Sequence, residues 1–191
     1  MATVFKVEFE GFKETEELFR QITNDFGAKD ASNIMRNAVR LSMKTVLNAA
    51  KNLAEKDTGA MAASLQIETR IPSKKDLRSK YVDRGDSVIS LVTTASGKKL
   101  AEKKFKNLKT GKKESFNIIT KQYYGKEVIS TDQRVSANEF GTSKMPSKPF
   151  LRPALEMSSG AIVDSLGNSL KIKLEQYKAK KIKDAAKKLK G

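Results

Sequence analysis

The sequence predicts an α+β fold, in which a small antiparallel or mixed sheet packs against two or three helices. Predicted helices and strands do not alternate regularly along the chain, as they would in an α/β protein with a parallel sheet. Two long stretches of helical character, residues 30–55 and 153–188, flank several short strand patterns. An inserted basic hairpin or loop and a C-terminal helix complete the predicted fold.

The N-terminal residues predict a strand and then a helix. Residues 4–10 place most of their apolar and charged side chains on opposite faces, and Gly11 ends this strand. Residues 14–26 have apolar side chains at helical spacing, with three glutamates in the first turns, where the helix dipole favours anions. Gly27 is the predicted stop of this helix.

The strongest helical pattern begins at a cap on Asp30 or Ser32 and continues to about Glu55. Its apolar residues recur at helical spacing, which gives the helix one apolar face. The motif Asp57-Thr58-Gly59 ends it. Asp57 is expected to accept backbone N–H groups, and Gly59 to supply a permissive backbone. Residues 60–64 are predicted to add one more turn.

The middle of the chain predicts strands separated by charged loops. Apolar and polar residues alternate over 65–70, residues 87–94 are rich in β-branched side chains, and the polar residues 73–86 predict a loop. Residues 96–114 contain eight lysines and predict a solvated loop or hairpin tip. Further extended segments are predicted at residues 115–120 and 128–140.

A C-terminal helix is predicted from Pro153, which fits a first helical turn, to about Lys188, with Gly160 and Gly167 as candidate breaks. Its apolar stripe consists of Ala161, Ile162, Leu166, Leu170, Leu174 and Tyr177. The lysine-rich end is expected to fray. We predict one domain over residues 1–160, with a basic insertion at about 96–127, and a helical lysine-rich extension over residues 161–191.

The composition excludes several classes of enzyme. Because the chain has no cysteine and no histidine, Ser-His-Asp, Cys-His and HExxH sites cannot form. We therefore predict a protein that is not an enzyme, with no catalytic residue, no metal ligand and no cofactor. No stretch approaches the ~20 apolar residues that span a bilayer, so we expect a soluble protein that is made in the cytoplasm and has no membrane contact.

The formal net charge of +16 is distributed unevenly. Residues 1–69 carry nine basic and ten acidic side chains, residues 70–134 carry seventeen and seven, and residues 135–191 carry twelve and five. The positive excess therefore lies in the middle and at the end of the chain. This asymmetry indicates an anionic partner, which the sequence leaves open between nucleic acid, a membrane surface and an acidic protein.

Residues 138–155 are distinctive because three of the four prolines lie within eight consecutive positions. The pattern predicts a strand that ends at Glu139 and Phe140, a turn at Gly141, and a stiff connector into the C-terminal helix. Its simplest interpretation is a rigid strand-to-helix connection that packs Phe150 on the core. The alternative is a rigid hinge that shapes a contact with another subunit.

Two motifs together resemble those of tail-completion proteins of tailed phages, which are also called neck or head–tail joining proteins. The first motif, after a long helix, is Asp57-Thr58-Gly59-Ala60 with Ser64-Leu65 shortly behind it. The second comprises Glu139-Phe140-Gly141-Thr142, then Met145-Pro146, then Lys148-Pro149-Phe150-Leu151-Arg152-Pro153-Ala154-Leu155.

The resemblance implies a virion structural protein of the phage neck, which completes the tail and joins the tail tube to the head connector. The implied partners are copies of the chain in a ring, expected to be a hexamer, with the head connector or stopper and the tail tube or tail terminator protein. Since a ring joins two different surfaces of each subunit, we expect a face of helix 31–55 and the connector 141–153 to contribute to these contacts.

The lysine-rich segment has two interpretations. It is either a solvated loop or a surface for electrostatic contact with passing DNA or an acidic neighbouring ring. Contact with sliding DNA would be weak, independent of sequence and sensitive to salt. A different class of protein also fits the charge, namely a small basic nucleic-acid-binding protein. The lysines concerned are Lys98, Lys99, Lys103, Lys104, Lys106, Lys109, Lys112 and Lys113.

Two short motifs have superficial likenesses to known sites. Asp57-Thr58-Gly59 also occurs in aspartic proteases, but there it belongs to a strand and loop of an all-β fold, whereas here it follows a long helix. Gly97-Lys98-Lys99 and Gly111-Lys112-Lys113 lack the residue spacing of a phosphate-binding P-loop. Neither motif therefore predicts catalysis.

Overall fold

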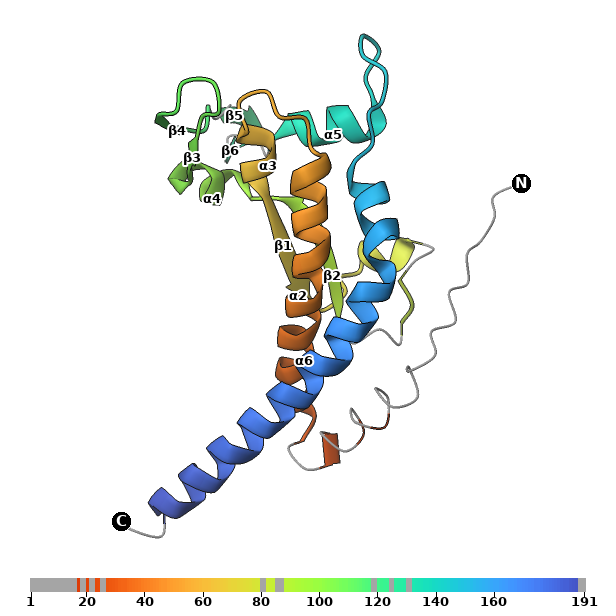
Figure 1. Ribbon diagram of the computed structural model, residues 1–191, viewed down its shortest axis with the longest axis vertical. Coiled ribbons are helices and arrows are strands. Elements are labelled where there is room, and N and C mark those ends of the chain that lie inside the picture. Colours follow the sequence, from red (N-terminus) through yellow and green to blue (C-terminus); the bar gives the residue numbers. More distant parts are fainter. Residues whose placement is uncertain are drawn as a thin grey trace, which may run out of the picture. The chain divides into compact units, whose positions relative to one another are not determined.

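The computed structural model describes residues 27–79, 82–84, 88–117, 120–123, 126–129 and 132–188, together with Glu17, Arg20, Thr23 and Asn24. The predicted strand at residues 4–10 lies outside the described residues. Only four residues of the predicted helix at 14–26 are described, and all four are helical. The described chain is α+β with a long C-terminal helix, which confirms the predicted fold class (Figure 1).

The chain divides into two compact units. The first unit contains residues 1–42, 69–89 and 160–191, and the second contains residues 43–68 and 90–159. Two long helices, α2 (Ala28–Leu53) and α6 (Leu151–Lys188), contribute residues to both units. The helix α2 begins two residues before the predicted cap at Asp30.

The core of the first unit is formed by α2 and α6. Ala31, Ile34 and Ala38 are spaced three and four residues apart on α2, and all three are buried. They pack with the fully buried Leu170 of α6 and with the partly buried Met35, Leu166 and Tyr177. Because two of the three core positions on α2 are alanines, the two helices can approach closely at this contact.

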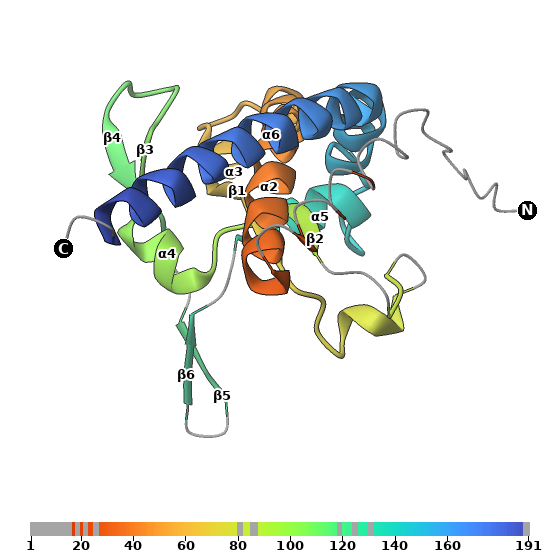
Figure 2. The same ribbon diagram turned by 90° about the horizontal axis from the view of Figure 1, so that it is seen from below.

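Strands pair in three two-stranded sheets within the described residues. In chain order the pairs are β1 (Leu65–Arg70) with β2 (Ile89–Thr94), β3 (Lys104–Lys106) with β4 (Lys113–Ser115), and β5 (Thr120–Tyr123) with β6 (Lys126–Ile129). The second and third pairs are antiparallel, and Figure 2 shows them as two separate hairpins. The strands predicted at 65–70 and 87–94 are confirmed, although β2 begins at Ile89.

One core cluster of the second unit lies where two short helices, α3 (Ala60–Ser64) and α4 (Gly97–Glu102), meet the β3–β4 hairpin. Its buried residues are Ala60, Ala95, Leu100 and Phe116. Phe105 of β3 covers them, with its ring centroid 4.9 Å from that of Phe116 and the two planes inclined at 49°. Such an aromatic pair contributes about 0.5–1.5 kcal/mol beyond the area that it buries.

The lysine-rich residues 96–114 are more ordered than a solvated loop. They form α4, then β3, then a tip over residues 107–112 and the start of β4, so the hairpin alternative of the prediction is correct. The strand predicted at 115–120 is wrong for Phe116 and Asn117, because β4 ends at Ser115 and Phe116 is buried in the core, whereas residues 118–119 lie outside the described residues.

Residues 133–140 form the helix α5 (Gln133–Phe140), so the predicted strand ending at Glu139 and Phe140 is wrong. Asp132 caps the helix by accepting the N–H of Arg134 at 3.2 Å. The buried residues Val135, Asn138 and Glu139 follow helical rather than alternating spacing. Two of these three side chains are polar, and for that reason an apolar periodicity did not reveal the helix.

The helix α6 continues without a break from Leu151 to Lys188, so neither Gly160 nor Gly167 interrupts it. Pro153 lies in its first turn, as predicted. Leu166, Leu170 and Tyr177 of the predicted stripe contribute to the core of the first unit, whereas Ala161 is exposed. A single helix therefore begins in the second unit and ends in the first.

The loop after β1 is fixed by an ion pair between Arg70 and Asp76. The guanidinium contacts both carboxylate oxygens, and the N–H of Ser73 donates to the same carboxylate at 2.7 Å. The hydrogen bonds from Arg70, and then those from Ser73, hold the pKa of Asp76 well below its usual range. The pair therefore contributes stability above the ordinary carboxyl pKa of ~3.9, and this stability is lost as the pH falls through the lowered value.

Gly160 and Gly27 provide a matched pair of substitutions, because an added Cβ meets nothing within 4 Å at either position. Gly160→Ala is expected to stabilise the chain by about 0.5–1 kcal/mol, since alanine loses less entropy in a continuous helix. Gly27→Ala is expected to destabilise it by about 1 kcal/mol, since Gly27 has a φ of 79°. Urea denaturation measures both signs, and a loss of stability in Gly160→Ala would contradict an unbroken α6.

Candidate functional site

The N-terminus of α6 is capped by Glu139, a residue of a different helix. The side chain of Glu139 is buried at the end of α5. Its carboxylate accepts hydrogen bonds from the backbone N–H groups of Phe150 at 2.9 Å, Leu151 at 3.0 Å and Arg152 at 3.3 Å. The carboxylate thus meets three free donors at the positive end of the helix dipole, where a negative charge is most favourable.

Proline removes the next free donor of the same helix end. Pro153 has no N–H, and the N–H of Ala154 already donates to the carbonyl of Phe150 at 3.1 Å, the first bond of the helix. Every backbone donor of this turn is therefore either bonded or absent. This explains in physical terms why Glu139 and Pro153 belong to one motif.

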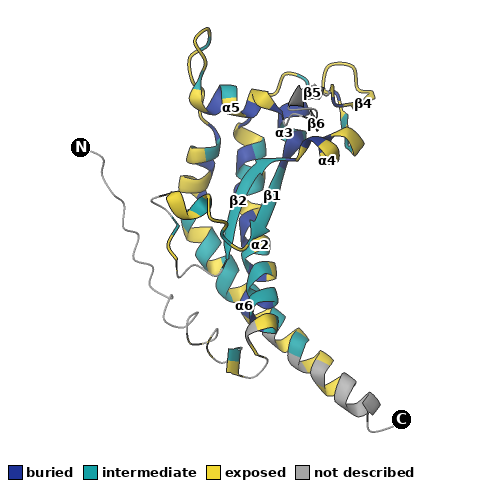
Figure 3. Cartoon of the chain, turned by 180° about the vertical axis from the view of Figure 1, so that it is seen from behind, coloured by how far each residue is buried: buried dark blue, intermediate teal, exposed yellow. Residues whose placement is uncertain are grey.

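The connector between α5 and α6, residues 141–150, is fixed by its own backbone bonds. The N–H of Gly141 donates to the backbone carbonyl of Ala137 at 2.9 Å, and the N–H of Lys148 donates to the backbone carbonyl of Asn138 at 2.7 Å. Between these points Thr142 and Met145 bond to each other in a narrow loop. Most of its residues are exposed, whereas Phe150 at its base is buried (Figures 1 and 3).

Asn138 connects the two sequence motifs in space. Its side-chain amide contacts the sulfur of Met61 at 3.3 Å and donates to the carbonyl of Arg134 at 3.0 Å. Met61 belongs to α3, which directly follows Asp57-Thr58-Gly59. The segment after the first motif therefore packs against the helix that holds Glu139 of the second.

The Asp57-Thr58-Gly59 segment holds the tip of the β3–β4 hairpin. The carbonyl of Thr58 accepts the N–H of Leu108 at 3.1 Å, and the carboxylate of Asp57 pairs with the ammonium of Lys109. Gly59 has a φ of 78° and lies against the side chain of Leu108. Asp57 was expected to accept backbone N–H groups, and its observed partner is instead a lysine.

Two hollows among the described residues of the second unit adjoin the motif residues. One of about 450 Å³ lies between α3, the β3–β4 hairpin and the start of α5, where Asp132 forms a two-pronged pair with Arg134. Hydrogen bonding to Asp132 raises the pKa of Arg134. The other, of about 460 Å³, lies between α2, β2, α5 and the start of α6. Its lining is mostly apolar and includes Phe140 and Leu155.

Large apolar side chains are exposed at both ends of the connector. Phe140 is 73 % exposed, Leu155 is 48 % exposed and Met157 is 75 % exposed. Phe140 ends α5, and the other two lie in the second turn of α6. Phe140 and Leu155 line the same hollow, and exposed apolar groups that lie close together mark candidate contact sites with other proteins.

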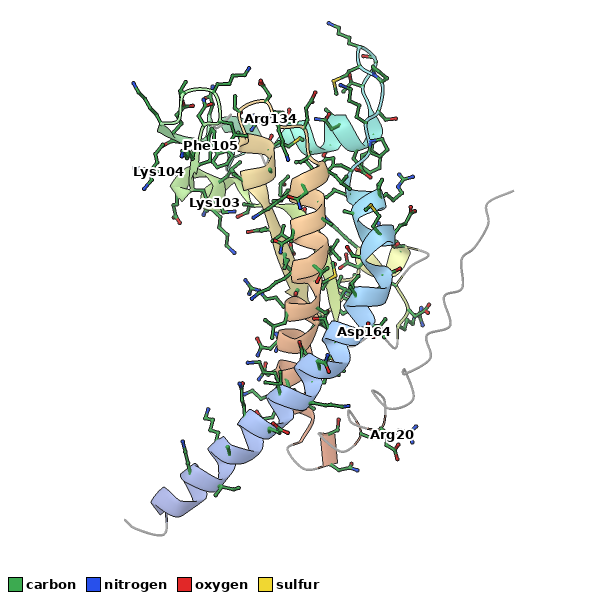
Figure 4. All side chains as sticks on the ribbon, in the orientation of Figure 1. Arg20, Lys103, Lys104, Phe105, Arg134 and Asp164 are labelled. Carbon is green, nitrogen blue, oxygen red and sulfur yellow. The ribbon has the colours of Figure 1, made fainter. Side chains whose placement is uncertain are left out.

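The eight candidate lysines are not equivalent in the structure. Lys109 is paired with Asp57, and Lys103 is half-buried and donates to the carbonyl of Ala63 at 3.3 Å. The side chains of the other six are exposed, namely Lys98, Lys99, Lys104, Lys106, Lys112 and Lys113. Figure 4 labels Lys103, Lys104 and Phe105, where the chain passes from α4 into the hairpin.

The structure brings together most of the predicted motif residues, but not through the expected geometry. Glu139, Phe150, Leu151, Arg152 and Pro153 meet at one helix end. Thr142, Pro146 and Pro149 are exposed along the connector, and Phe140 and Gly141 end α5. Sequence reasoning missed Met61 and Asn138. The one available signal for α5 was the capping residue Asp132 ahead of Val135, Asn138 and Glu139.

The described part of the chain is an α+β protein, and its candidate site is the connector that Glu139 and the backbone hydrogen bonds hold in place. It holds no group of three or more Asp, Glu, His or Cys side chains that could bind a metal ion. None of its described helices is long and apolar enough to cross a membrane. A scan against protein-family models found no match, and searches of curated proteins and of solved structures found no similar chain.

Removal of the Glu139 carboxylate is expected to destabilise the chain. Glu139→Ala leaves three backbone donors without their partner and should cost about 2–3 kcal/mol, whereas Glu139→Gln keeps one acceptor and should cost less. The exposed Glu156 of α6 is the control, and Glu156→Ala should change stability by less than about 0.5 kcal/mol. Urea denaturation measures the costs. Equal effects of Glu139→Ala and Glu156→Ala would contradict the capping role.

Substitution of Gly141 is expected to distort the base of the connector. Its φ of 76° and ψ of 179° are rare for L-amino acids, and an added Cβ would lie 2.9 Å from the backbone nitrogen of Ser147. Gly141→Ala should therefore cost about 1–3 kcal/mol and expose the connector to limited proteolysis. A variant with unchanged stability and cleavage rate would show that the connector has another backbone geometry.

Proposed function

We propose that the chain is a non-enzymatic structural subunit of a tailed-phage neck. In this role it completes the tail and joins the tail tube to the head connector as a ring. The observation that carries the proposal is the pair of motifs around Asp57 and Glu139, which resemble those of neck proteins. The contact between Asn138 and Met61 supports the proposal. Met61 follows the Asp57 motif and Asn138 precedes Glu139, so two segments that are distant in sequence pack together within one compact unit.

The connector has the physical properties that a contact element of a ring needs. Most of its residues are exposed, and Glu139 and the backbone bonds at its base hold it in one shape. A loop that is already ordered loses less conformational entropy when a partner binds it. The proposed contact therefore begins from a preformed surface.

Different surfaces of the second unit are available for the two sides of a ring contact. One surface is the connector with its flanking apolar residues Phe140, Leu155 and Met157. Another is the polar exposed face of α2, which includes Lys44, Thr45 and Asn48. A closed ring joins unlike surfaces of adjacent copies, and we propose a hexamer, in keeping with tail symmetry. The proposed neighbours are the connector or stopper on the head side and the tube or terminator on the tail side.

Deletion and complementation in the phage that encodes the chain test the neck role. Deletion should produce filled heads and separate tails that do not join, as electron microscopy would show. A complementing copy of the unchanged chain should restore joined virions and plaques. Normal virions from the deletion strain would exclude the neck role. A monomeric chain in solution would not, because such rings form on a partner.

Matched variants locate the subunit contact within this assay. Replacing exposed apolar residues beside the connector, in Phe140→Ser with Met157→Ser, should reduce plaque formation at least tenfold. The control replaces Ile172 and Ile182, which are 53 % and 70 % exposed on α6, with serine. If both double variants complement equally well, the connector flank is not a subunit contact, even where the deletion phenotype supports the neck role.

A further inference from the structure

The outer face of the β3–β4 hairpin carries three lysines. The strands pair with Lys104 opposite Ser115, Phe105 opposite Glu114, and Lys106 opposite Lys113. Because alternate residues of a strand point to opposite faces, Lys104, Lys106, Lys113 and Ser115 share one face. All four are exposed, whereas Phe105 packs on Phe116 in the core. We call Lys104, Lys106 and Lys113 the lysine face.

The lysine face is not neutralised within the described chain. None of its three lysines forms an ion pair with a described residue. Lys106 and Lys113 are directly opposite each other, an arrangement in which like charges repel and weaken a strand pair. A bound anion would relieve this repulsion. Without a bound anion, only dissolved salt screens the repulsion between the two lysines.

Glu114 of β4 and Asp57 beside the hairpin tip have partners other than the lysine face. Glu114 faces away from the lysine face and accepts hydrogen bonds from the amide of Asn107 at 2.8 and 2.9 Å and from the hydroxyl of Thr110 at 2.9 Å. Asp57 is paired with Lys109 at the tip. The hairpin thus uses its carboxylates to fix its own fold, and its outer face remains positive.

The lysine face lies on a rigid support. At the tip, the N–H of Asn107 donates to the backbone carbonyl of Lys112 at 2.9 Å, and the N–H of Gly111 donates to the backbone carbonyl of Asn107 at 2.8 Å. The bond from Leu108 to Thr58 fastens the tip to the body of the unit. Binding of a partner at this face therefore orders lysine side chains only. The entropic cost of binding is lower than it would be if the loop had to become ordered as well.

Neighbouring lysines extend the positive surface. Partial burial lowers the pKa of Lys103, and the charges of Lys51 and Lys99 lower it further. Lys51 is on α2, far from the lysine-rich segment in sequence but in the same unit. Lys51 of α2 and Lys99 of α4 therefore both add to the positive potential at Lys103.

We propose that the lysine face binds the phosphate backbone of double-stranded DNA without regard to sequence. Lys104 and Lys106 are two strand residues apart, about 7 Å, so their ammonium groups can reach separate phosphates. Its four positions, Ser115 included, offer no apolar or aromatic anchor of the kind that dominates protein contacts, and no arginine to read base edges. The inference concerns the chain alone and stands whether or not the neck role holds.

A salt series with matched variants tests the proposal. The purified full chain is titrated onto a labelled DNA duplex of arbitrary sequence at several salt concentrations. The variant K104Q/K106Q/K113Q should bind about tenfold or more weakly at low salt, and its slope of log K against log salt should be shallower by up to about three. The control K171Q/K180Q/K183Q removes the same charge from exposed positions of α6 and should keep the original slope.

Further measurements make every result decisive. Circular dichroism and urea denaturation confirm that the variants are folded, and K104R/K106R/K113R should restore binding because it restores the charge. Equal weakening in the two glutamine variants would overturn the proposal, since binding would then follow net charge rather than this face. Absence of duplex binding by the unchanged chain would overturn it too. So would binding to polyglutamate that is tighter than binding to DNA and depends on the same three lysines, because the partner would then be an acidic protein.

Discussion

The buried carboxylate of Glu139 at the N-terminus of α6 is the interaction on which the rest of the second unit depends. It satisfies three backbone donors that would otherwise lie unbonded beside a buried phenylalanine. An unmet donor that is buried costs roughly 1–3 kcal/mol, and of the three bonds only the one from Phe150 is fully buried. The carboxylate reaches the three donors because the end of α5 lies beside the beginning of α6. The connector between the two helices must therefore return to its starting point within a short loop. Gly141, with its positive φ, and Pro153, which has no N–H, are both compatible with this geometry.

The two sequence motifs have complementary structural tasks. Glu139 of the second motif holds the end of the connector through hydrogen bonds. In the first motif, Thr58 bonds to Leu108 and Asp57 pairs with Lys109, and both contacts hold the hairpin tip. Asn138 and Met61 join the two arrangements, so the connector and the hairpin are presented by one body. Asp57, which belongs to a motif that also occurs in aspartic proteases, pairs here with Lys109 at the hairpin tip.

Charge is partitioned within the hairpin. Its acids form hydrogen bonds or ion pairs that fix the tip, and its lysines remain on the outer face and on α4. A chain with this net charge repels itself, so a folded support for closely spaced lysines needs compensating contacts. The aromatic pair of Phe105 and Phe116 provides them on the inner face. The positive surface is therefore a property of the fold and not only of the composition.

The sequence by itself determined the fold class, the long helix α2, the turn at α3, the strands β1 and β2, and the helical C-terminus, because each has a local periodicity or a local stop signal. It also indicated the buried Phe150 and the permissive Gly59. Only the tertiary structure decided that Glu139 and Asn138 lie on a helix, since their polar side chains are buried by bonds to residues that are distant in sequence. The same holds for the lysine face, which requires the register of β3 and β4, and for Lys51, which approaches Lys103 only after folding. Local propensity carries no information about such pairings, because their energy comes from contacts between separate elements.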